Sequence, residues 1–206
     1  MNIIEKRELR NELILTYNIK YPVITFSNYD IGKTSFNQYN LEKAKKLEHI
    51  VVTELYEDAK KTYDYNISNG YPVMVYEVIL DYTITFNDEY IVSLFYDQYE
   101  FTGGAHGNTI RTSQTWDLCI GKQLPLSYFY PDNPNYVTEI LREINNQIKY
   151  QIEAGNNYYF DNYCELILET FKLENYYLTP GGIVVYFQQY DIAPYSSGIR
   201  EFYLPF

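Results

Sequence analysis

The strongest constraint on the fold is a strict alternation of side chains between residues 74 and 86. Every even-numbered residue of this stretch is apolar or aromatic, and most odd-numbered residues are polar. A β-strand points successive side chains to opposite faces, so this period of two predicts a long strand with one buried face. Asn87 and Asp88 then predict a hairpin turn, residues 90–101 the returning strand, and residues 108–118 a third strand.

Two other stretches have the period of a helix. Between residues 35 and 70 apolar side chains recur every three or four positions, as in a long amphipathic helix. A second helix is predicted after Pro131–Pro134, with Gly155 as its stop. The two apolar stripes consist of Ala44, Leu47, Val51, Leu55 and Ala59 in the first helix, and of Val137, Ile140, Leu141, Ile144, Ile148 and Ile152 in the second.

The order of these elements predicts the fold class. Residues 13–26 are rich in β-formers, residues 162–173 suggest a short helix, and residues 182–190 and 198–204 read as final strands. We therefore expect an α+β fold: a mostly antiparallel sheet with a long N-terminal helix and a second central helix packed on one face. The length of 206 residues suits a single globular domain, 1–206, with two possible subregions, 13–87 and 88–206.

Composition excludes several functions and favours others. The chain has 16 Lys and Arg against 27 Asp and Glu, a net charge of −11, which argues against nucleic-acid binding and favours basic partners. No apolar run is long enough to span a membrane. The charged N-terminus lacks the pattern of a signal peptide, which suits either a cytoplasmic protein or an excised ectodomain. Cys119 and Cys164 are expected in the core, and whether they pair is left open.

The segment Phe101–Thr109 (FTGGAHGNT) is the first candidate site. Three glycines in five residues predict a specially shaped loop, because glycine reaches positive φ and permits close approach. His106 is the obvious catalytic candidate, since histidine titrates near neutral pH, and Asp97 or Glu100 could orient it. The favoured interpretation is a histidine that holds the loop in shape. With only two widely spaced histidines, His49 and His106, neither a metal nor a cofactor is expected.

Two further features admit a simple structural explanation. Glu77 and Asp81 share the polar face of the predicted strand about 13 Å apart, too far for a glycosidase pair, and a solvated face accounts for them. The segment Tyr190–Gly198 combines Pro, Gly and small residues with two tyrosines. It is either an ordinary long connection or a loop shaped for recognition.

Two parts of the chain together resemble a known family. They are Phe101–Thr109, followed by Trp116-Asp117-Leu118 and Gly121-Lys122, and the stretch from Tyr177 through Gly198. The resemblance is to a bacterial extracytoplasmic family of unknown function, seen in the ectodomain of the lysozyme-sensing anti-sigma factor RsiV and in accessory regions of peptidoglycan deacetylases.

The resemblance implies a non-catalytic ligand-binding domain on the surface of, or secreted by, a Gram-positive bacterium. The implied partner is a basic protein such as lysozyme, although this chain has neither an anti-sigma segment nor a deacetylase domain. We expect Tyr195 and neighbouring aromatic residues to anchor the partner in a groove between two loops. The expected binding residues are Thr102, Gly103, Gly104, Ala105, His106, Tyr190, Pro194, Tyr195 and Ser196.

Two alternatives stay open. The chain could bind peptidoglycan, with tyrosines and Trp116 stacking on sugar rings. It could also be a hydrolase in which His106 works with a carboxylate.

Overall fold

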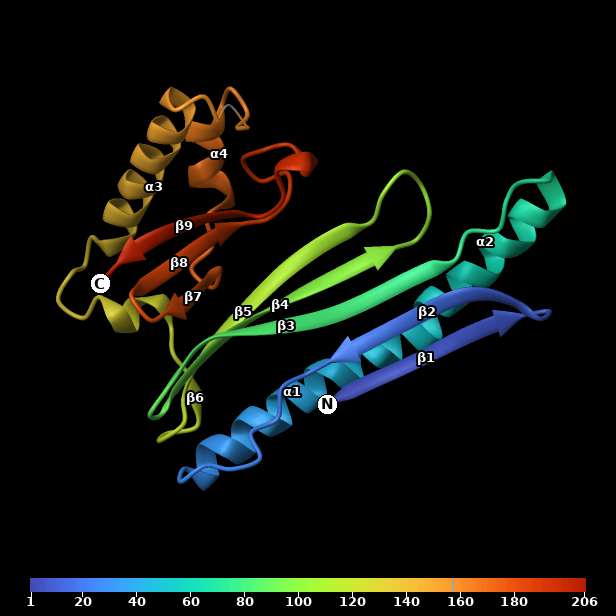
Figure 1. The fold of residues 1–206 in the computed structure, drawn as a ribbon, viewed down its shortest axis with the longest axis horizontal. Helices are drawn as coiled ribbons and strands as arrows, with labels where there is room; N and C mark the ends of the chain where they lie inside the picture. The colour runs from blue at the N-terminus through green and yellow to red at the C-terminus, as the bar shows by residue number, and fades with distance from the viewer. Residues whose placement is uncertain (157) are drawn as a thin grey trace. The chain divides into compact units, whose positions relative to one another are not determined.

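The computed structural model describes residues 1–156 and 158–206. Spatial contacts divide the chain into two compact units: unit 1 holds residues 1–82 and 96–110, and unit 2 holds residues 83–95 and 111–206. The described residues form a six-stranded sheet in the order β1-β2-β3-β4-β5-β6 and a three-stranded sheet in the order β7-β8-β9 (Figure 1). The predicted α+β class is confirmed, whereas the predicted single domain with its two subregions stays a prediction.

The six-stranded sheet contains the strands that the sequence predicted and two that it did not reveal, β1 and the two-residue β6. Strand β1 pairs antiparallel with β2 through a turn in which Arg10 and Asn11 both have positive φ. Its four consecutive charged residues, Glu5 to Glu8, suit an edge strand, because charged side chains discourage pairing with other chains. The strands are β1 (Asn2–Leu9), β2 (Glu12–Lys20), β3 (Tyr76–Asp88), β4 (Ile91–Phe101), β5 (Asn108–Asp117) and β6 (Lys122–Gln123).

The predicted long helix is confirmed, running from Asp30 to Asn69 as α1 (Asp30–Ile50), a π-helical turn (Val51–Leu55) and α2 (Tyr56–Asn69). It ends at Gly70, whose φ of 72° lets Tyr71 donate a hydrogen bond back to the Asn66 carbonyl at 2.8 Å. Because the helix connects β2 to β3, these strands pair in parallel, with Leu15 opposite Tyr76. The sheet is thus mostly rather than wholly antiparallel.

In unit 1 the helix packs on the sheet through its apolar stripe and through a buried polar contact. Both α1 and α2 contact β2 (Figure 1). Asn40 is fully buried in α1, where its side-chain amide donates to the Phe36 carbonyl and accepts a hydrogen bond from the Tyr96 hydroxyl. Since a buried polar group is costly unless it is hydrogen-bonded, this contact favours one register of helix against strand.

Unit 2 is built around the three-stranded antiparallel sheet. Strand β8 is buried on both faces: Ile183, Val185 and Phe187 join the main cluster with the stripe of α3, while Val184 and Tyr186 pack with Phe95 and Tyr177. The helices and strands predicted here are confirmed with small shifts of their ends, and β7 is a strand that the sequence did not reveal. Their bounds are α3 (Tyr136–Glu153), α4 (Tyr163–Thr170), β7 (Tyr176–Thr179), β8 (Gly182–Phe187) and β9 (Arg200–Pro205), with short 3-10 turns at Leu126–Phe129 and Tyr195–Ser197.

A buried arginine organises the polar side of unit 2. Arg111 is 9% exposed, forms an ion pair with Glu201, and places its guanidinium 3.7 Å from the centre of the Phe95 ring. Its backbone exchanges two hydrogen bonds with the Gln188 side-chain amide, at 2.9 and 2.7 Å. The ion pair, the ring stacking and the hydrogen bonds of Arg111 therefore link β5 to β9 and to the residue that follows β8.

Both cysteines lie at the surface of the protein. The expectation of core cysteines is wrong: Cys119 and Cys164 are both exposed and unpaired. Cys119 lies in the turn after β5, and Cys164 lies on α4, where its Sγ is 3.5 Å from Oδ1 of Asn145 on α3. Across residues 1–156 and 158–206, no helix has the length and apolar character needed to cross a membrane.

Candidate functional site

The loop Thr102–Gly107 connects β4 to β5, and its three glycines serve two purposes. Gly103 and Gly104 adopt φ values of 103° and 89°, which are strained for any residue with a side chain. Gly107 instead lies against the strand: a Cβ atom there would come within 2.5 Å of the Tyr99 ring and 2.6 Å of the Glu100 carbonyl oxygen. The loop is thus turned by two glycines and pressed onto β4 by the third.

His106 projects from this loop into solvent, with one ring nitrogen bound to the backbone. Its Nδ1 lies 2.9 Å from the Gly107 carbonyl oxygen, so this nitrogen carries the proton and donates. The contact agrees with the interpretation that His106 helps to shape the loop. Of the carboxylates near it in sequence, Glu100 is half-buried, and burial raises the pKa of its carboxyl above the usual range.

A hollow of about 420 Å³ lies beside the loop, entirely within unit 1, and Glu77 is the carboxylate that lines it together with His106. The preceding residue, Tyr76, donates from its hydroxyl to Asp58 on α2, so Glu77 points to the opposite face of the sheet. Sequence reasoning placed Glu77 on a solvated face and missed its neighbours. The hollow is lined by Thr16, Val75, Glu77, Tyr99, Phe101, Ala105 and His106.

The second predicted loop, Tyr190–Gly198, joins β8 to β9 in unit 2. Its middle is anchored, because Ile192 and Ala193 are almost fully buried in the main cluster, and the Ile192 carbonyl accepts a hydrogen bond from the Phe160 amide at 3.1 Å. At the start of the loop, the Asp191 carboxylate accepts a hydrogen bond from the Gln188 backbone N–H at 2.7 Å. Burial raises the pKa of the Asp191 carboxyl.

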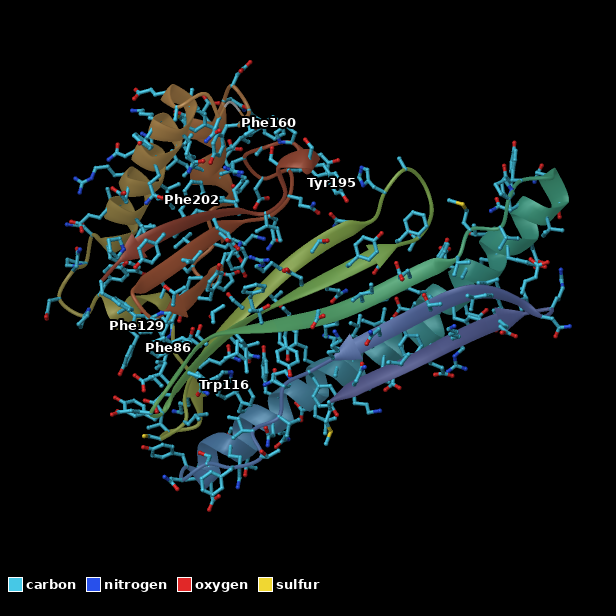
Figure 2. The ribbon with its side chains drawn as sticks, viewed as in Figure 1. Phe86, Trp116, Phe129, Phe160, Tyr195 and Phe202 are labelled. Carbon is cyan, nitrogen blue, oxygen red and sulfur yellow. The ribbon has the colours of Figure 1, made fainter. Side chains whose placement is uncertain are left out.

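The anchored loop presents aromatic and small side chains outward. The rings of Tyr190 and Tyr195 lie 5.7 Å apart between centroids, tilted by 33°, and Tyr195 occupies the 3-10 turn labelled in Figure 2. Pro194 and Ser196 beside it are exposed. The predicted residues Tyr190, Pro194, Tyr195 and Ser196 therefore share one surface loop.

The two predicted loops belong to different units: Thr102–Gly107 to unit 1 and Tyr190–Ser196 to unit 2. Their expected convergence stays a prediction. One proposed sugar-stacking residue is excluded, because Trp116 is only 4% exposed and its indole N–H donates to the Gln114 side chain at 2.6 Å.

A second hollow, of about 350 Å³, lies wholly in unit 2 and includes Ser113, Tyr136 and Tyr176 in its lining. Two of its hydroxyl groups already have partners: Tyr176 donates to the Leu124 carbonyl at 2.5 Å, and Ser113 donates to the Glu174 carbonyl at 3.0 Å. Burial raises the pKa of Tyr176 to about 12, so it is protonated at neutral pH. Nowhere in the described parts of the chain do three His, Cys, Asp or Glu side chains gather as potential metal ligands.

Comparison with known proteins places each loop in a separate family match. Residues 9–109, which include the glycine loop, match the family described as Deacetylase PdaC. Residues 129–206, which include the tyrosine loop, match the family described as Protein of unknown function (DUF3298). The chain therefore contains one segment similar to each of these two families. The resemblance stated from the two motifs is confirmed at this level, while the link to the RsiV ectodomain stays a prediction.

Solved structures from the DUF3298 family share the fold. A family member from Bacteroides fragilis aligns over 100% of this chain and 88% of its own, with a TM-score of 0.69 and 21% identity. A DUF3298 family protein from Pseudomonas aeruginosa PAO1 covers 100% of this chain and 89% of its own, with a TM-score of 0.57 and 17% identity. No curated protein matches the sequence. At these identities the likeness concerns the fold alone.

Proposed function

We propose that the chain is a non-catalytic, extracytoplasmic ligand-binding domain of the sensor type, whose partner is a basic protein such as lysozyme. The PdaC match supports a cell-wall setting, and the net charge of −11 suits a basic partner. The expected location is the surface of, or the space outside, a Gram-positive cell. This location and the link to the RsiV ectodomain come from the motif resemblance.

One observation carries the proposal: an aromatic pair presented by a loop that the core holds in place. Ile192 and Ala193, which lie between Tyr190 and Tyr195 in the chain, are buried, so the two rings need little further ordering when a partner binds. Binding energy at protein interfaces concentrates in a few aromatic or arginine residues, and a preformed loop lowers the entropic cost of using them.

Charge supports the same partner class. Unit 2, which carries the tyrosine loop, has thirteen Asp and Glu against six Lys and Arg. Such an excess draws basic proteins toward the surface and accelerates encounter, an effect that salt weakens. The charge therefore predicts an association rate that depends on salt. The aromatic pair is expected to slow dissociation of the partner.

Calorimetric titration with an animal lysozyme tests the proposal. We expect micromolar or tighter binding at about 50 mM salt and weaker binding at about 300 mM, where screening is stronger. Tyr195→Ala should weaken binding by about 2 kcal/mol, or roughly thirtyfold. The control is Tyr150→Ala, which removes a tyrosine that is 74% exposed on α3 of the same unit and should leave the affinity unchanged. Absence of heat at micromolar concentrations would exclude lysozyme.

A second candidate is recognition of cell-wall polysaccharide, which the PdaC match favours. Here Tyr190 and Tyr195 would stack on sugar rings, since Trp116 is buried. Retention of the chain on purified peptidoglycan, lost in Tyr195→Ala and kept in Tyr150→Ala, would support this reading over the protein partner.

The hydrolase alternative now involves His106 and Glu77, because both line one hollow. If the wild-type chain hydrolyses or deacetylates wall material and His106→Gln leaves that activity unaltered, this alternative is excluded.

A further inference from the structure

Glu77 is a carboxylate that lines an aromatic hollow. It is exposed on β3, and no hydrogen bond or ion pair joins its side chain to any other residue that the structure describes. Two rings on β4, those of Tyr99 and Phe101, line the same hollow, together with Ala105 and His106 of the glycine loop. The lining contains no lysine or arginine, so the charge of Glu77 is not neutralised from within.

Another carboxylate on the same strand face shows the contrast. Asp81 lies four residues along β3 and is paired with Lys20 on β2, Nζ to Oδ2 at 2.6 Å. This partner lowers the pKa of Asp81. The residue of β2 that lies in register with Glu77 is Thr16, which carries no charge. The next strand, β1, places Lys6 in register with Thr16, about 10 Å from Glu77 across two strand spacings.

We propose that this hollow is a subsite for a cationic side chain, an arginine or a lysine, supplied by a basic protein partner. A carboxylate accepts charge-assisted hydrogen bonds from guanidinium or ammonium groups. Aromatic ring faces attract the same cations, and Tyr99 and Phe101 flank the site. The subsite rests on the proposed function for the identity of its partner, but its chemistry is that of unit 1 alone.

The glycine loop explains why the hollow exists. Gly107 holds the loop against Tyr99, and the positive φ angles of Gly103 and Gly104 return the chain toward β5. Ala105 and His106 are thereby placed at the rim of the hollow. A small residue at position 105 leaves room for an incoming side chain, and the bond from His106 to the Gly107 carbonyl fixes the rim.

The test uses a small probe, N-acetyl-arginine amide, and its uncharged isostere, N-acetyl-citrulline amide. Both are titrated into the 15N-labelled full chain, and the amide signals of Glu77, Ala105 and His106 are followed. We expect saturable shifts with the arginine probe at about millimolar affinity, and at least tenfold weaker effects with the citrulline probe. Glu77→Gln should weaken arginine binding about tenfold, whereas Asp81→Asn, on the same strand face, should leave it unchanged.

Equal responses to the two probes, or arginine binding that survives Glu77→Gln, would overturn the subsite. The lysozyme titration separates this failure from that of the proposed function. If lysozyme binds wild type and Glu77→Gln equally, the subsite is wrong and the binding domain remains. If the arginine probe binds but lysozyme does not, the subsite remains and the partner is another basic protein.

Discussion

Replacing Arg111 by alanine should lower the free energy of unfolding by about 3 to 4 kcal/mol. The guanidinium is 9% exposed, pairs with Glu201 and stacks 3.7 Å from the centre of the Phe95 ring. Alanine removes the ion pair, the stacking and the aliphatic stem in one step. The loss stays below that of a fully buried pair, because the Glu201 side chain is 44% exposed and water can hydrate its freed carboxylate.

Urea denaturation followed by circular dichroism measures this effect. The control is Arg142→Ala, which removes an exposed arginine from α3 of the same unit and should change stability by less than about 0.5 kcal/mol. If both variants lose similarly small amounts of stability, the contacts of Arg111 with Glu201 and Phe95 do not hold β5 and β9 together.

The second large effect is expected at Gly107. Its replacement by alanine should cost about 3 kcal/mol, because the new Cβ would overlap both the Tyr99 ring and the Glu100 carbonyl oxygen. The backbone oxygen belongs to the paired strand β4, so it cannot move aside without disturbing the sheet. The loop must instead lift from Tyr99. This movement would open the hollow and weaken the binding of the arginine probe as well.

Gly104→Ala separates this overlap from backbone strain. Gly104 has a φ of 89° but nothing within 4 Å of the position of a Cβ atom, so alanine there should cost only about 1 kcal/mol. Thermal unfolding of both variants provides the measurement. If Gly104→Ala proves as damaging as Gly107→Ala, strain in the loop, rather than packing on Tyr99, is the dominant constraint.

The regular elements could be predicted where one pattern dominates locally. The alternation from Met74 to Phe86 and the stripes of both long helices describe one-sided burial, which is a local property of the sequence. The sequence did not reveal β1, because its alternating residues are half-buried or exposed at a sheet edge. It did not reveal the parallel pairing of β2 with β3, since strand order depends on contacts between distant residues.

The same distinction applies to the site. Glycine content identified the loop at residues 102–107, because positive φ is a property of single residues. The role of Gly107 differs from that of Gly103 and Gly104, and only the packing against Tyr99 reveals it. The sequence did not indicate that Glu77 lines a hollow, because its neighbours Thr16 and Tyr99 come from strands that are far apart in the sequence. The parallel pairing of β2 with β3 was missed for the same reason. Arg111 gave no pattern at all.

The central claim is that the tyrosine loop, Tyr190–Ser196, binds a basic protein. Nuclear magnetic resonance mapping of the 15N-labelled chain during addition of lysozyme tests it most directly. We predict that the amide signals of Tyr195 and Ser196 shift or broaden as lysozyme is added, and the subsite predicts the same for Gly103, Gly104 and His106. Perturbation confined to other surfaces, while Tyr195 and Ser196 keep their free-state signals, would contradict it.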